Sequence, residues 1–462
     1  MSLSPVDSID PNAQDRSVDA GVPCARYPLG PLEEVFWSFG NRFHGDGTAA
    51  LSARIGGHID TERLAAALLV LQKRHPRLRS RIVVGTDGRA LYEVFPTMAP
   101  IPVHVKRFDT VDLPWAEEAQ RAVATDFEEG APLCHVTVLQ STTHPVAELV
   151  MTFHHSLTDG TSGMLLFHEL LSRYEALQQG TPVEAILDAT EPLPFVAADV
   201  PPITAPWRDR WAMFWRLVRG YVRKRRANWT ALPRDSDEYT AKWSRHVLSA
   251  EATTAIERAC RKQRLPVYGA VFALATTSLA EALRDEPVQF ICRCPINMRE
   301  LPYCNRVISY EHLGCYVSGL DRPYTLKRPY AFWDLARAAC ADVREYTMRQ
   351  GPAMALKLVP MVDRLQRWLR ISPRRPPMRD TMSINYIPCP PIVKRQYGDL
   401  ALEEISGLNR CRYVGVSLMI GAILFKGRLN LSLGAVNVSE RLRTDFHAAL
   451  ARNIERLARG EI

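Results

Sequence analysis

The alternation of apolar and polar positions predicts strands and helices in turn along most of the chain. Residues 147–153 are mostly apolar or branched, which is typical of a buried strand. Directly behind them, residues 161–174 carry apolar side chains at helical spacing, which predicts a helix. Apolar stretches around 64–71, 270–275 and 446–457 predict further helices. Strands that alternate with helices indicate an α/β fold.

A proline-rich connector divides the chain into two lobes. We place this connector at 179–240, because its prolines interrupt regular structure: Pro192, Pro194, Pro201, Pro202 and Pro206. The N-terminal lobe is then expected at 27–178 and the C-terminal lobe at 241–462. Residues 1–26 are polar and contain proline, so we expect a flexible segment there.

Length and composition agree with a globular two-domain protein. The chain has 462 residues, of which 47% are hydrophobic and 23% charged. No apolar run is long enough to span a bilayer. The ten cysteines lack the spacing of a zinc site and no signal-peptide pattern precedes them, so we expect reduced thiols, no bound metal and a cytoplasmic location. Cys134 is expected to pack in the interior rather than act as a nucleophile.

The turn between the predicted strand and helix carries the candidate chemistry. It reads His154-His155-Ser156-Leu157-Thr158-Asp159-Gly160, an HHxxxDG pattern held between two rigid elements. A histidine has an unperturbed pKa near ~6.5, so it can accept a proton from an alcohol, amine or thiol at neutral pH. We assign this chemistry to His155, and group His154 and Asp159 with it as the catalytic residues.

Asp159 has a different expected role, which is to fix the turn. It lies four residues after His155, too far along a tight turn to face the imidazole by default. It could accept backbone N–H bonds at the helix start or pair with an arginine from elsewhere. An isolated HxxxD pattern is more often a packed histidine followed by a turn. The doubled histidine, the terminal glycine and the strand–helix context favour a functional site.

The motif resembles the signature of the chloramphenicol acetyltransferase-like superfamily. This superfamily includes nonribosomal peptide condensation domains, polyketide-associated acyltransferases, alcohol acetyltransferases and wax ester synthases. Weaker resemblances to its other segments follow in the family's order over residues 27–458: Gly57–Leu64, Arg74–Arg79, Cys294–Arg299, Leu313–Ser318 and Ser383–Tyr386. The similarity therefore covers nearly the whole chain.

The resemblance implies a fold, a reaction and a set of site residues. It implies a two-lobed α/β fold, each lobe like a chloramphenicol acetyltransferase subunit, with a tunnel between the lobes. No cofactor is bound; acyl-CoA or a phosphopantetheinyl thioester is the co-substrate, and no acyl-enzyme forms. Arg299 is the first candidate to pair with Asp159 and Arg79 the second. Gly160, Ser383 and Asn385 are the candidate substrate-binding positions, the last two as oxyanion donors.

Two segments interleave aromatic or apolar residues with arginines and lysines. They lie at 207–229 and 356–379, and they supply much of the formal net charge of +8. Each could be a surface helix with a solvated basic face, a helix in a membrane interface, or a docking site for an acidic carrier protein or for the phosphates of coenzyme A. We hypothesise peripheral contact with the inner face of a membrane. No nucleic-acid motif accompanies the charge, so nucleic acid is not an expected partner.

From these features we predict an acyltransferase that moves an acyl group from a thioester to a hydroxyl acceptor and forms an ester. The donor is acyl-CoA or an acyl carrier protein, and the acceptor a hydrophobic alcohol. A chain without adenylation or carrier domains favours ester over amide formation. The alternatives are an amide-forming condensation enzyme and a non-catalytic binding module of the same fold. The retained His155, Asp159 and Gly160 count against the binding module.

Overall fold

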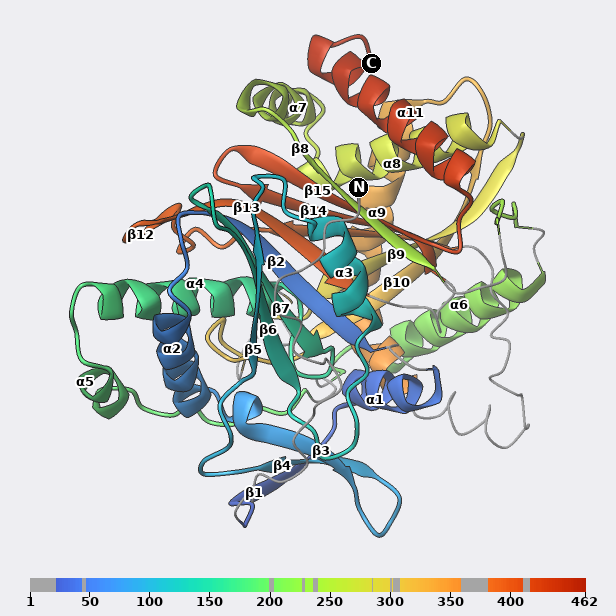
Figure 1. Ribbon diagram of the computed structural model, residues 1–462. Helices are drawn as coiled ribbons and strands as arrows, with labels where there is room; N and C mark the ends of the chain where they lie inside the picture. The colour runs from blue at the N-terminus through green and yellow to red at the C-terminus, as the bar shows by residue number, and fades with distance from the viewer. Residues whose placement is uncertain are drawn as a thin grey trace. The chain divides into compact units, whose positions relative to one another are not determined.

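The computed structural model divides the chain into two compact α/β units (Figure 1). The first comprises Met1–Ala198, Ile308–Cys315 and Cys389–Arg410, and the second comprises Asp199–Val307, Tyr316–Pro388 and Cys411–Ile462. The structure describes the following residues: 22–43, 47–198, 203–226, 229–235, 240–284, 286–299, 301, 308–358, 381–409 and 416–462. Most of the predicted flexible segment 1–26 lies outside this range.

The first unit is built on a six-stranded sheet. Its strand order is β12 (Gln396–Tyr397), β13 (Leu400–Asn409), β2 (Thr48–Gly56), β7 (Val146–His154), β6 (Cys134–Ser141) and β5 (Val103–Phe108). A small sheet adds β1 (Ala25–Pro28), β4 (Ala90–Val94) and β3 (Ser80–Val84). The helices are α1 (Pro31–Phe43), α2 (Thr61–Arg74), α3 (Trp115–Ala124), α4 (Gly160–Gln178) and α5 (Val183–Asp188), with a 3₁₀ turn, η1 (Pro76–Arg79).

Helices cover both faces of this sheet around the central strand β7. The Trp115 indole of α3 donates a hydrogen bond to Ser52 of β2. The next residue along β2, Leu51, lies against Gly163 of α4. Successive strand residues point to opposite faces, so α3 and α4 lie on opposite sides of the sheet. Every residue of β7 is buried as a result, which explains its nearly continuous apolar sequence.

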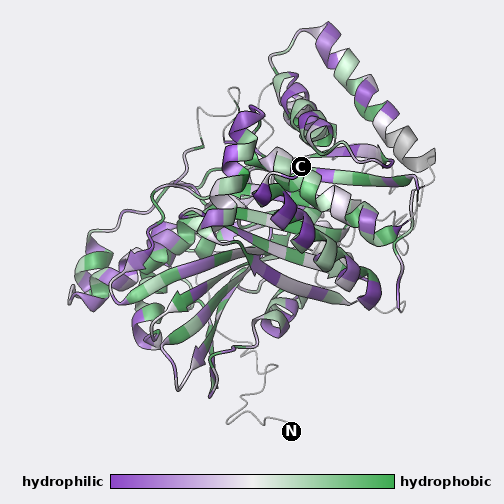
Figure 2. Ribbon diagram, turned by 90° about the horizontal axis from the view of Figure 1, so that it is seen from above, coloured by the Kyte–Doolittle hydropathy of each residue, from purple (hydrophilic) through white to green (hydrophobic). Residues whose placement is uncertain are grey.

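The second unit has its own six-stranded sheet and core. The strand order is β10 (Val317–Leu326), β9 (Val288–Asn297), β11 (Thr381–Pro388), β14 (Val416–Phe425), β15 (Arg428–Val436) and β8 (Ala241–Val247). The helices are α6 (Trp207–Arg226), α7 (Ala250–Lys262), α8 (Val267–Leu283), α9 (Phe332–Met348) and α11 (Glu440–Arg459). Residues Gly269 to Ala280 of α8 are all buried, and α8 packs against α9 and α11. Figure 2 shows hydrophobic residues along the strands and mixed faces on many of the helices.

The predicted elements are confirmed, but the chain crosses between the units more often than a linear division allows. The strand 147–153 is β7, and the predicted helices correspond to α2, α4, α8 and α11. Residues 308–315 and 389–410 were expected in the C-terminal lobe at 241–462, but they belong to the first unit. Residues 389–410 belong to the first unit because β13 pairs with β2, with Ala401 opposite Gly56 at one end and Asn409 opposite Ala49 at the other. The backbone hydrogen bonds of that ladder tie a late segment to the first sheet.

No single described helix is long and apolar enough to cross a membrane. Helices α7 and α8 meet the length and composition required only as a pair, bent by 107°. Of the two basic segments, the first forms α6 over residues 207–226, whereas most of 356–379 lies outside the described residues.

Candidate active site

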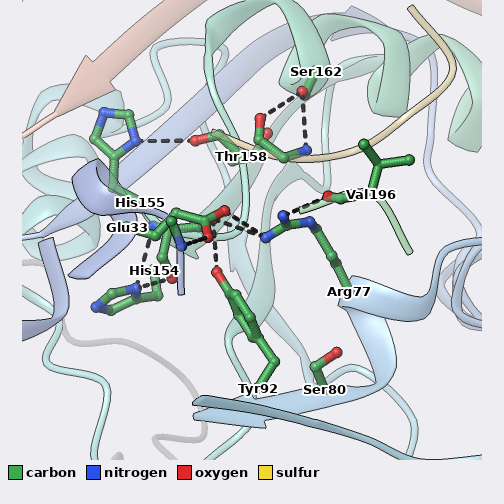
Figure 3. A network of polar contacts seen from close by, with 12 residues as sticks. Glu33, Arg77, Ser80, Tyr92, His154, His155, Thr158, Ser162 and Val196 are labelled. Carbon is green, nitrogen blue, oxygen red and sulfur yellow. Dashed lines mark hydrogen bonds and ion pairs between the residues drawn. The ribbon is translucent and has the colours of Figure 1, made fainter. Parts of the chain in front are cut away.

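The HHxxxDG segment forms the turn between β7 and α4 (Figure 3). β7 ends at His154, and α4 begins at Gly160. Asp159 is the N-cap residue of α4 and has extended backbone angles. The predicted strand-to-helix turn is therefore confirmed. It places the two adjacent histidines at the C-terminal end of the central strand β7.

The backbone carbonyl of Thr158 determines the tautomer of His155. Its Nδ1 lies 3.0 Å from the carbonyl oxygen of Thr158. A carbonyl only accepts hydrogen bonds, so Nδ1 carries the proton and Nε2 keeps a lone pair. The ring stacks on Phe36 with centroids 4.2 Å apart, and the backbone N–H donates to the carbonyl of Gly47. These contacts hold the imidazole in one orientation, with Nε2 ready to accept a proton.

Gly47 is a position where only glycine fits. Its φ is +98°, and an added Cβ would lie 2.7 Å from the carbonyl oxygen of Phe36 and 3.6 Å from Nε2 of His154. The residue that accepts the His155 N–H therefore also lies against the other histidine of the motif.

Burial lowers the pKa of His155 below its ordinary value. The hydrogen bond to Thr158 and the charge of Asp159 oppose this shift. The imidazole is therefore neutral at pH 7, which is the form that acts as a base. His155 is half-buried, whereas its neighbour His154 is only 3% exposed.

His154 has the opposite tautomer and a packing role. Its Nδ1 accepts from the backbone N–H of Ser156 at 3.3 Å and lies 2.6 Å from the Ser156 hydroxyl, so the proton is on Nε2. The ring packs edge-on against Trp37 and Phe127. Burial and the neighbouring His155 lower the pKa of His154 to about 3. This histidine stays neutral and shapes the turn, so we assign it a positioning role.

Asp159 stabilises the start of α4, as one of the two sequence-based alternatives predicts. Its carboxylate accepts the backbone N–H of Ser162 at 2.8 Å, and the residue is 3% exposed. The Ser162 hydroxyl in turn donates to the carbonyl of Gly314 at 3.0 Å. The other alternative, an ion pair with Arg299, stays a prediction.

A buried ion pair behind the turn was missed by the sequence analysis. Arg77 donates to Glu33 at 2.7 Å, and both side chains are at most 1% exposed. Arg77 also lies 3.4 Å from the Ser156 carbonyl, which the Tyr92 hydroxyl approaches at 2.9 Å. Arg77 further donates to the carbonyl of Val196. Figure 3 shows Glu33, Arg77 and Tyr92 pointing toward one another beside the two histidines.

No local sequence signal distinguishes Arg77 from its neighbours. Arg74, Arg77 and Arg79 lie within six residues, and Glu33 precedes Arg77 by 44 positions. Arg79, the second candidate partner of Asp159, donates to the backbone carbonyls of Gln72 and Phe95. Only the tertiary structure selects Arg77 as the arginine that supports the motif.

The remaining predicted site residues lie in the second unit. Arg299 is 3% exposed, and its guanidinium lies 4.4 Å from the ring centre of Tyr316. Ser383 and Asn385 are two residues apart on β11 and point to the same face, where the serine hydroxyl donates to the Asn385 Oδ1 at 2.9 Å. That contact leaves the amide N–H groups of Asn385 as donors.

Two buried cysteines, Cys134 and Cys294, do not have the chemistry of nucleophiles. Burial raises the pKa of Cys134 far above its ordinary value, and it raises the pKa of Cys294 to about 11. A thiol in this state is protonated at pH 7 and weakly nucleophilic. The packing role expected for Cys134 is confirmed by its burial in β6.

Comparison with known proteins identifies the family. A family model described as Condensation domain matches residues 44–352, which include the whole HHxxxDG turn. The chain belongs to the condensation domain family. Condensation domains are acyl-transfer catalysts that take carrier-bound thioester substrates and need no metal.

Individual relatives of this condensation domain show how far the similarity extends. The PKS-NRPS hybrid synthetase cheA of Chaetomium globosum is 30% identical over 178 residues, which are 38% of this chain and 4% of that protein. The chain thus corresponds to a small part of this relative's length.

Solved structures confirm the two-lobed fold over nearly the whole chain. Polyketide synthase associated protein 5 from Mycobacterium tuberculosis matches with a TM-score of 0.62 and 18% identity, covering 93% of this chain and 98% of that one. The first condensation domain of the CDA synthetase matches with a TM-score of 0.65 and 15% identity, covering 93% and 97%. At these identities the similarity shows the fold alone.

Breaking the ion pair behind the turn should cost much stability. Arg77→Met removes the guanidinium that pairs with the buried Glu33 carboxylate, so we expect a loss of about 3–5 kcal/mol in the free energy of unfolding. Urea unfolding followed by circular dichroism measures it. The double variant Glu33→Gln, Arg77→Met should regain part of the loss.

Arg26→Met is the matched control. Arg26 pairs with Glu93 at 2.7 Å but is 65% exposed, so the loss of stability in Arg26→Met should stay under about 1 kcal/mol. Equal losses for Arg77→Met and Arg26→Met would contradict the assignment.

Two substitutions of Asp159 separate its two possible roles. Asp159→Ala removes the helix cap and should lower the free energy of unfolding by about 0.5–2 kcal/mol. Asparagine also caps helices, so Asp159→Asn should keep most of the stability if the cap dominates. An equal loss in both variants would point to an ion pair instead. Full stability of Asp159→Ala, measured by thermal unfolding, would contradict a structural role.

Acid should destabilise the protein through His154. The folded pKa of about 3 lies below the unfolded value near ~6.5. Between these values the unfolded chain binds a proton that the folded chain does not, so stability falls as the pH falls. By pH 5 the loss reaches about 2 kcal/mol. In His154→Asn the drop in free energy of unfolding between pH 7.5 and about 5 should be smaller by that amount. An unchanged drop would show that His154 titrates normally.

Proposed function

We propose that this condensation domain transfers an acyl group from a pantetheine thioester to a hydroxyl acceptor, with His155 as the general base. The observation that carries the proposal is the hydrogen bond from Nδ1 of His155 to the Thr158 carbonyl. It leaves Nε2 unprotonated, and burial lowers the pKa of His155 so that this state predominates at pH 7.

In the proposed reaction His155 accepts one proton from the acceptor and passes it to the leaving group. The acceptor O–H gives its proton to Nε2 while its oxygen attacks the thioester carbonyl. The tetrahedral intermediate then collapses, the C–S bond breaks, and the leaving thiolate takes the proton from the imidazolium. A positioned base of this kind contributes roughly 100- to 10,000-fold to the rate.

Of the two candidates Ser383 and Asn385, Asn385 is the proposed oxyanion donor and Ser383 its orienting partner. The Ser383 hydroxyl donates to Asn385 Oδ1, which orients the Asn385 amide and leaves its N–H groups free to donate. Their common face on β11 supports the assignment. We also propose that the acceptor is a hydrophobic alcohol. The donor acyl group is carried by coenzyme A or by a carrier protein.

Amide formation is the second candidate. A match to a protein named as a hybrid with a nonribosomal peptide synthetase favours an amine acceptor. The same base serves both reactions, because only the attacking atom differs. Product analysis therefore decides between them.

The test uses the purified chain with acyl-CoAs and carrier-bound acyl thioesters, each offered to alcohol and amine acceptors. Mass spectrometry of the products identifies an ester or an amide. His155→Ala should lower kcat by about 100- to 10,000-fold, whereas His58→Ala at an exposed position should not change it. The wild-type kcat/KM should fall only below pH ~6.5, since protonation of His155 requires a lower pH. An amide product would contradict the ester proposal, and full activity of His155→Ala would contradict the proposed base.

A further inference from the structure

Helix α6 exposes three tryptophans on one face. Trp207, Trp211 and Trp215 follow one another at four-residue spacing, so they line one side of the helix. Their exposed fractions are 64%, 54% and 50%. The other exposed large hydrophobic residues of the described chain lie singly on separate segments: Val22, Leu69, Val84, Val111, Tyr310, Met348 and Ile392. The tryptophan face is thus a concentrated apolar surface.

The opposite side of α6 is anchored within the second unit. Met213 is 2% exposed, and Arg216 forms a two-pronged ion pair with Glu345 of α9. The Gln350 side chain accepts the backbone N–H groups of Thr204 and Ala205 just before the helix begins. These contacts fix α6 against α9 (Figure 1), and leave the tryptophan face turned away from the anchor.

Positive charge accompanies this face. The sequence of α6 contains eight arginines and lysines and one acidic residue, Asp209. The net +7 of this helix compares with a formal net charge of +8 for the whole chain, so the rest is nearly neutral. Arg208 and Arg219 are exposed and each lies next to the tryptophan face, with the Arg208 guanidinium 5.6 Å from the Trp207 ring centre.

We infer that α6 is a membrane-binding helix that rests on the surface of an anionic bilayer. Tryptophan rings favour the bilayer interface, where the ring is buried among lipids and the indole N–H meets water. Arginines beside them pair with anionic headgroups. An acidic protein would satisfy the arginines but would not require three exposed indoles in a row. The inference is independent of the proposed reaction.

The test is co-sedimentation of the full chain with phosphatidylcholine vesicles, with and without phosphatidylglycerol. Wild type should bind the anionic vesicles at least roughly tenfold more strongly than the neutral ones. Trp211→Ser with Trp215→Ser, or Arg208→Gln with Arg219→Gln, should each lower binding roughly tenfold or more. Vesicles with brominated phosphatidylcholine should quench the tryptophan fluorescence of wild type.

Matched controls keep the test specific. Leu69→Ser with Val84→Ser removes exposed apolar residues elsewhere, and Arg441→Gln with Arg452→Gln removes two exposed charges from α11; both should bind like wild type. His155→Ala should also bind like wild type, which separates this result from the proposed reaction. Equal binding by the α6 variants and wild type would overturn the inference. So would binding that needs the arginines but shows no quenching, which would indicate electrostatic adsorption without contact between the indoles and the lipids.

Discussion

The carbonyl of Thr158 and the backbone N–H of Ser156 impose opposite tautomers on two adjacent neutral histidines. The carbonyl requires a proton on Nδ1 of His155, whereas the N–H requires a lone pair on Nδ1 of His154. Both groups belong to the turn that follows β7. The path of this turn therefore decides which histidine presents a basic nitrogen and which packs as a neutral ring. Two identical side chains receive different roles from the backbone around them.

The Glu33–Arg77 pair supports this turn from behind. Burying two charges costs free energy that the pair regains only with good geometry and further hydrogen bonds. Here Arg77 also contacts two carbonyls, those of Ser156 and Val196, and Glu33 accepts the Gly30 N–H at 2.8 Å. The pair joins α1 and the η1 turn to the segment behind His155. Movement of the turn would break contacts of a buried charge, which favours a single arrangement of the motif.

Charge is distributed unevenly over the molecule. The interior of the first unit uses paired charges to hold the turn, while α6 concentrates positive residues beside three exposed indoles. Met213 and Arg216 of this helix make contacts within its own unit. Its exposed face is consistent with contact to an anionic surface, as the inference on α6 requires.

The sequence by itself determined the secondary structure around the motif and singled out His155 as the candidate base. Apolar periodicity reports local burial, so the buried strand β7 and the helices α2, α4, α8 and α11 could be read directly. The HHxxxDG spacing likewise pointed to His155 as the candidate base and to a structural role for Asp159, either as a helix cap or as the partner of an arginine. Only the tertiary structure decided that β13 joins the first sheet and that Arg77 supports the motif. Strand pairing and ion pairs of this kind join residues that are far apart in the sequence. Local periodicity reports only the burial of neighbouring residues, so it does not predict which distant segments meet.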